Sequence, residues 1–472
     1  MQRKTLFLFF LLALLAGCAT LAPNYSRPAA PVPTDWPGQG GETPATAGAA
    51  VAEIPWQDFF LDPQLRAVIA TALEKNRDLR LALLNMERAQ AEYRIRRADL
   101  LPALDGSAAG SVQRIPADLS ASGDGEIVRQ YSVGLGVSAF ELDLFGRVRS
   151  LKEQALEEYL ATSEARRSVE ISLVASVARA YLNLAADREG LQLARETLEN
   201  QQASYHLIER RFQAGVASAL DLNQARSSLE AARVDIARYT SLVAQDENGL
   251  DLLVGARVAA PLLPATLSTD PAPFRTLAPG LPSTVLLARP DIRAAEHRLQ
   301  GANANIGAAR AAFFPRIELV SSIGTGSDQL SGLFGAGSLA WNFAPRLTLP
   351  LFNAGANRAN LAVAKVDQQL AVARYEQAIQ VAFREVADAL AVRATIGEQA
   401  AAQQALTAAT AESYRLSQAR YARGIDSYLN VLDAHRSLYS ARQNLIGVRL
   451  ALLANQVTLY QVLGGGSSAA PL

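Results

Sequence analysis

The chain has 472 residues, of which 50% are hydrophobic and 19% charged, with 45 basic and 45 acidic side chains. This composition predicts a folded protein, and length alone suggests about three domains. The balanced charge argues against a nucleic-acid-binding protein, which is usually basic. The single cysteine and three scattered histidines exclude a disulfide framework and give no support to a zinc site or a histidine-based catalytic site.

The N-terminus predicts a secretion signal that ends in a lipid-attachment site. Two basic residues precede an almost unbroken apolar run over residues 6–15. The run is too short to span a hydrocarbon core about 30 Å thick and is typical of a signal-peptide core. It ends in Leu15-Ala16-Gly17-Cys18, which resembles the bacterial lipobox. We therefore expect a signal peptide over residues 1–17 and a lipid on Cys18; the alternative is an ordinary signal peptide with an incidental cysteine.

The segment after the lipobox is rich in proline, glycine, alanine and threonine. This composition predicts that residues 18–60 form an extended tether without a core of its own. Ala19 stands where, by resemblance to bacterial lipoproteins, an aspartate would retain the chain at the inner membrane. Sorting to the outer membrane is implied.

An internal repeat accounts for most of the remaining length. Tyr205 and Tyr414 lie 209 residues apart, as do Gly215 and Gly424, within segments of similar sequence. Other matching positions follow in the same order at similar offsets, which indicates one duplicated architecture and not three independent domains. The expected boundaries are a first repeat over 61–257, a linker over 258–288, a second repeat over 289–464 and a flexible tail over 465–472.

Each repeat begins with a predicted helix, over 65–99 or 291–312, followed by a proline and two strands that flank a polar loop. Apolar residues alternate with small or polar ones in these strands. The clearest alternating residues are Tyr131, Val133, Leu135 and Val137 in the first repeat, and Leu339, Trp341, Phe343 and Leu347 in the second. The pattern suits tilted membrane-spanning strands, and the alternative is a half-buried sheet in a soluble protein.

Very long helices are predicted after the strands. Residues 148–213 and 356–422 contain no proline and one glycine each, and apolar residues recur every seven positions. Such a sustained repeat indicates long helices packed side by side, as in coiled coils. We expect Gly215 and Gly424 to end these helices and turn the chain back.

Closure of the strands requires more than one copy of the chain. Backbone groups at an open sheet edge cannot be satisfied in lipid, so membrane strands must close into a barrel. One chain supplies four strands, and two copies would give an eight-stranded barrel whose interior is largely filled by side chains. Three copies would enclose an open lumen, and the same threefold operation would arrange the long helices into a second cylinder.

Four features together are similar to those of the outer membrane factor family, most of all its branch of OprM-like, NodT-type efflux lipoproteins, with the TolC-like members more distant. They are the lipobox, the PNYSRP start over residues 23–28, the duplicated element order, and the tip motifs RFQAG (211–215) and RYARG (420–424). The resemblance implies an α+β membrane protein with an internal twofold repeat. It implies a trimeric transmembrane β-barrel with four strands per chain and twelve in all, continuous with a long α-helical barrel in the periplasm.

The same resemblance implies a passive exit duct of a tripartite efflux pump in the outer membrane of a Gram-negative bacterium, and not an enzyme. Its expected partners are two further copies of the chain, a periplasmic adaptor, outer-membrane lipid and an inner-membrane transporter of RND, ABC or MFS type. No nucleic acid, metal or cofactor is expected apart from the lipid on Cys18. The alternatives are a duct for polypeptides or metal ions, and a periplasmic coiled-coil scaffold without a pore.

A candidate gate follows the second tip turn. The spacing of Asp426, Asn430, Asp433 and Arg436 predicts one polar helix face, and by resemblance Asp433 and Arg436 match a gate pair. The resemblance also assigns Tyr421 to the constriction, Asp221 to the first hairpin's tip, and Gly215 and Gly424 to adaptor docking. The alternative is a solvated helix face with an incidental pair of about 0.2–0.5 kcal/mol.

Overall fold

The computed structural model describes residues 20–37, 51, 54–120, 123–268, 274–275, 277 and 283–466. The expected signal peptide, the expected lipid site Cys18 and residues 467–472 of the expected tail lie outside them. The chain divides into two compact units. The strand unit comprises residues 1–29, 85–162 and 294–375, and the hairpin unit comprises residues 30–84, 163–293 and 376–472.

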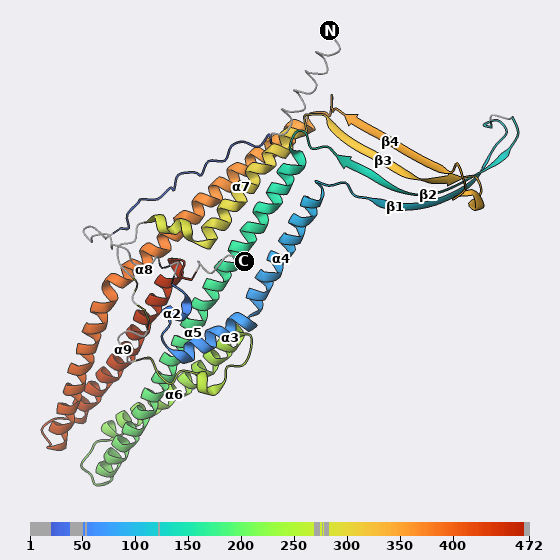
Figure 1. Cartoon of the computed structure of the whole chain (residues 1–472). Helices are drawn as coiled ribbons and strands as arrows, with labels where there is room; N and C mark the ends of the chain where they lie inside the picture. The colour runs from blue at the N-terminus through green and yellow to red at the C-terminus, as the bar shows by residue number, and fades with distance from the viewer. Residues whose placement is uncertain are drawn as a thin grey trace. The chain divides into compact units, whose positions relative to one another are not determined.

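The secondary structure has an order that is repeated once along the chain, as the sequence predicts (Figure 1). The first repeat contains α4 (Arg77–Ala98), β1 (Asp105–Ile115), β2 (Glu126–Glu141), α5 (Arg147–Gln213) and α6 (Ala219–Val254). The second contains α7 (Pro290–Ala311), β3 (Arg316–Ser327), β4 (Leu339–Thr348), α8 (Ala356–Ala422) and α9 (Tyr428–Val462). Short elements precede and connect the repeats: α2 (Trp56–Phe59), α3 (Pro63–Lys75), η2 (Ala260–Leu262) and η3 (Ser283–Ala288), with η4 (Leu330–Gly332) between β3 and β4.

The strand unit contains one four-stranded antiparallel sheet in the order β1-β2-β3-β4. Gly134 lies opposite Gly324 where β2 and β3 meet. A side chain on either glycine would overlap backbone atoms of the other strand, so glycine is required for this close approach. The first and last strands, β1 and β4, are the edges, and within the described chain neither edge has a further strand beside it. The predicted strands are therefore confirmed, but one chain leaves the sheet open.

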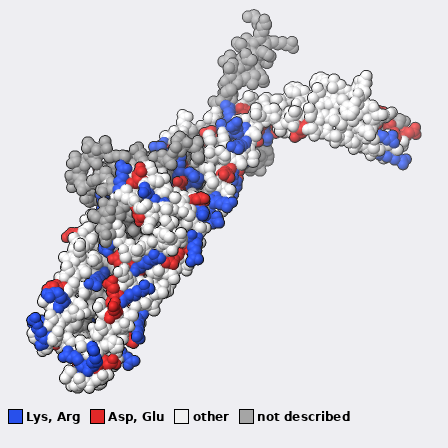
Figure 2. Space-filling model, turned by 60° about the horizontal axis from the view of Figure 1, so that its bottom comes forward, with Lys and Arg blue, Asp and Glu red and all other residues white. Residues whose placement is uncertain are grey.

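A band without charge crosses the sheet. In the described strands, the charged residues lie only near the strand ends, and the middle of each strand carries none. Figure 2 shows the same distribution, with an uncharged surface along the strands and charged side chains at their far end. Large apolar side chains in this band are exposed, including Leu135, Trp341 and Phe343. An uncharged band with exposed apolar residues is what a strand in contact with lipid requires.

The two long helices match the predicted stretches closely, and α5 and α8 each contain 67 residues. Helix α6 follows α5 and helix α9 follows α8, so each long helix forms a hairpin with its successor. We call α5–α6 the first hairpin and α8–α9 the second. Helices α5 and α9 contain windows apolar enough to cross a membrane, but 56% of that window in α5 is buried, as expected of a packed helix.

The prediction of one helix over 65–99 is wrong, because the helix is broken at Asn76. Its backbone adopts an extended conformation between α3 and α4. The Asn76 carboxamide oxygen accepts a hydrogen bond from the Leu79 amide at 2.8 Å, which caps the start of α4. The same side chain donates to the Leu253 carbonyl at 2.8 Å. An asparagine with two such partners favours a helix start over a continuous helix.

The described residues of the predicted tether, 18–60, have partners in both compact units, which its composition does not predict. Within the strand unit, Asn303 donates to the Pro23 carbonyl and Arg310 to the Leu21 carbonyl. Glu296 accepts hydrogen bonds from the Tyr25 hydroxyl at 3.0 Å and the Arg27 guanidinium at 2.7 Å. The described start of the chain is therefore fixed along α7.

In the hairpin unit, described residues of this segment and of the expected linker also have packing partners. Trp36 stacks on Phe383 of α8, and Phe59 stacks between Phe274 and Tyr460. Phe59 and Phe60 are fully buried, and Leu267 and Leu286 from the 258–288 stretch are nearly so. Both segments thus contribute side chains to the core, which sequence composition alone did not reveal.

Candidate gate at the helix tips

The two tip turns have the same backbone geometry. Gly215 and Gly424 both have φ of +74°. In the first turn the Val216 amide donates to the Arg211 carbonyl at 2.8 Å, and in the second the Ile425 amide donates to the Arg420 carbonyl at 3.0 Å. These bonds close each long helix with a glycine in the left-handed region. The predicted conformational role of both glycines is confirmed, and their role in adaptor docking stays a prediction.

The two turns differ in the helix start that follows. Ser218 and Asp221 form a capping box at the start of α6, in which each side chain bonds the backbone amide of the other residue at 3.0–3.1 Å. In the second hairpin, Asn430 takes the place of Asp221, and Ser427 makes no side-chain cap. The Asp221 carboxylate therefore has a structural use, which the resemblance to a gate aspartate did not predict.

Asp426 does not lie on the predicted polar helix face, because α9 begins only at Tyr428. Its carboxylate instead forms a two-bond pair with Arg420 at the end of α8, with distances of 2.5 and 3.0 Å. The hydrogen bond from Arg420 lowers the pKa of Asp426. This ion pair closes the tip turn across its base. Asp426 precedes α9, so the expectation that it lies on the helix is wrong, but its carboxylate still lies beside the Asn430 side chain.

Asp433 and Arg436 lie one turn apart on α9, and both are exposed. Among the ion pairs of the described residues there is none between them. Asn430 lies three residues before Asp433 and is also exposed. A polar stripe of these three residues is thus present, whereas a pairing of Asp433 with Arg436 stays a prediction for the assembled protein.

Tyr421 joins the two hairpins near their tips. The Arg211 guanidinium of α5 lies 4.9 Å from the centre of the Tyr421 ring, a distance typical of cation–π contacts. The ring also lies 5.6 Å from that of Tyr428 and packs on an apolar cluster. The buried members of this cluster are Ile208, Ala225, Tyr428 and Val431, from both hairpins. Tyr421 therefore has packing partners inside one chain, in addition to its predicted place at the constriction.

Sequence reasoning missed two polar links between the hairpins. Gln201 of α5 hydrogen-bonds the His435 ring of α9 at about 3.0 Å, and the Tyr439 hydroxyl of α9 donates to Asp235 of α6 at 2.8 Å. Burial, followed by the nearby charges of Arg442 and Arg436, lowers the pKa of His435. No motif marks these residues; the only sequence signal is their position beside the apolar seven-residue repeat.

The described contacts at the tips lie within and between the two hairpins. They combine ion pairs and aromatic packing with an exposed polar stripe at the end of two hairpins. Within the part of the chain that the structure describes, no group of three or more metal-ligating side chains occurs. Movement of the second hairpin relative to the first would break the Tyr421 and His435 contacts and displace the polar stripe.

Comparisons with known proteins agree with one another. The family model described as outer membrane efflux protein matches residues 68–256 and again 281–465. Two Pseudomonas putida proteins are each 49% identical over 98% of this chain and 96% of their own length: antibiotic efflux pump outer membrane protein ArpC and toluene efflux pump outer membrane protein TtgC. The open-state crystal structure of the Neisseria gonorrhoeae MtrE outer membrane channel superposes with a TM-score of 0.85 and 40% identity, covering 95% of this chain and 99% of that one.

Proposed function

Because the chain belongs to the outer membrane efflux protein family, we propose that three copies form the exit duct of a tripartite efflux pump in the outer membrane. The duct would be a twelve-stranded barrel in the bilayer, continuous with a helical barrel built from α4 to α9 in the periplasm. It conducts solutes passively and catalyses no reaction.

One observation carries this proposal: a four-stranded sheet with an uncharged, apolar-faced band and two edges that no other described strand pairs with. In lipid, the backbone groups of an open edge cost several kcal/mol each, so such a sheet must be closed by other strands. Threefold closure joins β4 of one copy to β1 of the next and leaves no edge. A soluble scaffold would instead need polar residues where Leu135, Trp341 and Phe343 are exposed.

Small organic molecules are the proposed cargo. The names of two relatives that are 49% identical to this chain refer to different compounds, antibiotics in one and toluene in the other. A duct of this kind accepts what its partners deliver, and the inner-membrane transporter sets the selectivity.

The partners follow from the two ends of the proposed assembly. A lipid on Cys18 and the apolar band would hold the duct in the outer membrane, since a single lipid chain gives only marginal anchoring. At the other end, the exposed tip turns at Gly215 and Gly424 would meet a periplasmic adaptor. The adaptor in turn connects the duct to the transporter.

The gate is assigned to the second hairpin. Three copies of Asp433 around a narrow axis would repel one another unless they were paired, and Arg436 of the same or the next copy can neutralise them. We expect Asp433→Ala combined with Arg436→Ala to raise the single-channel conductance of the purified protein in planar bilayers.

The first hairpin supplies a matched control. Glu230 and Arg233 form an ion pair at 3.1 Å with the same spacing on α6. Replacing both by alanine removes the same charges and should leave the conductance unchanged. Equal conductance of the wild type and the Asp433/Arg436 variant would contradict the gate assignment.

A further inference from the structure

The hairpin unit contains two joints at which one helix ends beside the start of another. At the first joint, the Asn76 carboxamide before α4 donates to the Leu253 carbonyl near the end of α6, at 2.8 Å. At the second, the Arg289 guanidinium before α7 donates to the Val462 carbonyl at the end of α9, at 2.7 Å. The donors lie 213 residues apart and the acceptors 209, which are offsets of the internal repeat. The two joints are therefore equivalent, but their donors differ.

The second joint is ionic. Arg289 is 9% exposed and makes three further hydrogen bonds, two to Asp291 at 3.0 and 2.7 Å and one to Glu385 of α8 at 2.9 Å. Burial alone disfavours the charged guanidinium, but its bonds to Asp291 and Glu385 more than offset this and raise its pKa. Arg289 is thus a buried cation that joins the start of α7, the middle of α8 and the end of α9.

The first repeat has no counterpart to this ion network. Helices α5 and α8 have equal lengths, and at their offset of 209 residues the counterpart of Glu385 is Ser176. At the first joint a neutral amide makes the bond, and a side chain on Gly255 would overlap the Lys75 carbonyl group. The first joint is therefore tightly packed, and a neutral amide takes the place of the guanidinium, although Asp78 matches Asp291 in the repeat.

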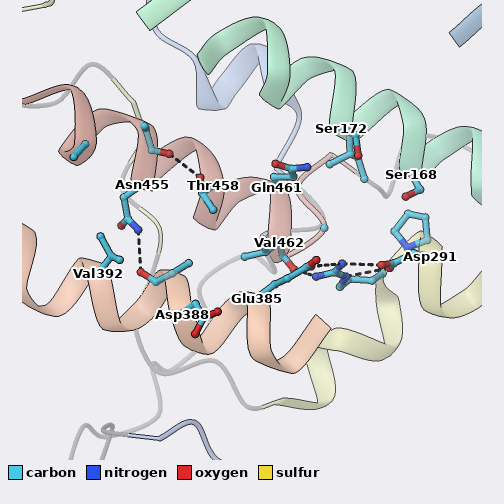
Figure 3. A pocket seen from close by; sticks show the side chains of 17 residues that line it. Ser168, Ser172, Asp291, Glu385, Asp388, Val392, Asn455, Thr458, Gln461 and Val462 are labelled. Carbon is cyan, nitrogen blue, oxygen red and sulfur yellow. Dashed lines mark hydrogen bonds and ion pairs between the residues drawn. The ribbon is translucent and has the colours of Figure 1, made fainter. Parts of the chain in front are cut away.

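The second joint borders water. It lies on a cleft of about 670 Å³ between α5, α8 and α9, whose lining includes Ser168, Asp388 and Thr458 (Figure 3). Asp291 and Glu385 both extend toward the same point beside Val462 in this view. Their side chains are 39% and 36% exposed, so water can replace either carboxylate at the guanidinium. An ion pair of this kind can open and close, whereas the sealed amide joint cannot without unpacking.

We propose that Arg289 is a positioning residue that holds the second hairpin in the position seen here through Asp291 and Glu385, and that this position keeps the gate closed. Because α9 is one continuous helix from Tyr428 to Val462, a change at its end is transmitted to Asp433 and Arg436 near its start. Release of the ion pairs frees the second hairpin, while the joint at Asn76 keeps the first in place. This inference rests on the proposed function, since it presumes a gate on the second hairpin.

The test is single-channel recording of the full-length assembled protein carrying Glu385→Gln, which removes the charge and keeps the shape. The measured quantity is the fraction of time that the channel is open. Coupling between two sites typically corresponds to a factor of five or more, so we expect about a fivefold rise in the open fraction. Glu385→Ser, which copies the first repeat, should give the same result if Glu385→Gln assembles poorly. The matched control is Glu398→Gln, an exposed position on the same helix.

A purely structural role predicts a different result. In that case Glu385→Gln would reduce the amount or heat resistance of the assembled protein and leave the open fraction of the remaining channels unchanged, which would overturn the proposal. If Asp433→Ala with Arg436→Ala opens the channel and neither Glu385 variant does, the proposed role of Arg289 is wrong, whereas the gate assignment is supported. If neither the wild type nor any variant conducts, the proposed function as a duct is wrong, and the proposed role of Arg289 fails with it.

Discussion

Ser218 and Ser427 occupy equivalent places in the two hairpins, and only one of them is used as a helix cap. Ser218 exchanges hydrogen bonds with Asp221, whereas Asn430 replaces that aspartate in the second hairpin and no side-chain cap forms. The start of α6 is therefore capped by side chains, whereas the second tip turn is closed by the Arg420–Asp426 ion pair before α9 begins. The second keeps an uncapped start beside the predicted gate, which agrees with a role for the second hairpin as the moving one.

Ser218→Ala should weaken the first turn of α6 by about 1 kcal/mol, the usual cost of removing a serine cap. We expect faster amide hydrogen exchange at Asp221 and Leu222 in this variant, because both amides lose part of their local protection. Ser427→Ala is the control, since that side chain caps nothing, and exchange at the start of α9 should stay the same. Equal effects of the two substitutions would show that the capping box contributes nothing.

The motif over residues 23–28 also gains a physical explanation at this scale. Pro23, Tyr25 and Arg27 are the residues of the motif that bond α7, through Asn303 and Glu296. Sequence reasoning used the motif only as a resemblance, because nothing local predicts which helix such a segment contacts. Its partners lie about 270 residues later in the chain.

At the scale of the elements, the sequence predicted the helices and helix ends that depend only on residues close to them in the chain. The absence of proline over 148–213 and 356–422 gave the long helices, and Gly215 and Gly424 gave their ends, because these residues act on their own backbone. The break at Asn76 was missed, because it depends on the Leu253 carbonyl of a distant helix. The site was predicted only in part for the same reason: the Asp426–Arg420 and Gln201–His435 contacts require the folded tip.

Helices α5 and α6 bring two aspartates together in the hairpin unit. Burial, followed by a hydrogen bond and charge repulsion from Asp187, raises the pKa of Asp246 from its ordinary value of 3.8 to about 6. Its Oδ2 atom is buried and accepts no hydrogen bond from the described donors. A carboxyl group whose pKa is higher in the folded state favours folding at low pH, and this contribution is lost as the pH rises from about 4 through about 6.

We therefore expect Asp246→Asn to raise the melting temperature at pH 7.5 and to leave it nearly unchanged at pH 4, where the native side chain is already neutral. Asp187→Asn should have a similar effect, since it removes the repelling charge. The double variant should gain less than the sum of the two, because both substitutions relieve the same repulsion. Thermal unfolding of the detergent-solubilised protein at the two pH values measures this, and a gain of equal size at both would contradict the assigned cause.

For the whole molecule, closure of the sheet decides between a duct and a scaffold. The strands alternate in direction from β1 to β4, so β4 of one copy can pair antiparallel with β1 of another. Such a contact is heterologous, and it gives a closed ring only when the rotation between copies returns to its start. The long helices alone do not distinguish these cases, because coiled coils occur in both. The edge strands distinguish the two cases, because a duct requires β4 of one copy to pair with β1 of the next and a scaffold does not.

Cross-linking between edge strands tests this directly, because Cys18 is the only cysteine of the chain and is expected to be blocked by lipid. Ser107→Cys on β1 is combined in turn with Ala340→Cys, Asn342→Cys or Ala344→Cys on β4, so that the three pairs cover neighbouring registers. A bis-maleimide applied to outer membranes should give covalent dimers and trimers for at least one pair, with nothing larger, because a ring of three has no free edge left.

The inner strands provide the control, since Ser132→Cys on β2 with Ser322→Cys on β3 places both thiols away from any edge. That pair should give no links between copies under the same conditions. A ladder that extends beyond trimers would mean an open chain of sheets, and a stop at dimers would mean an eight-stranded barrel without a useful lumen. Either result would remove the passage that the proposed function requires, whatever the tips of the helices do.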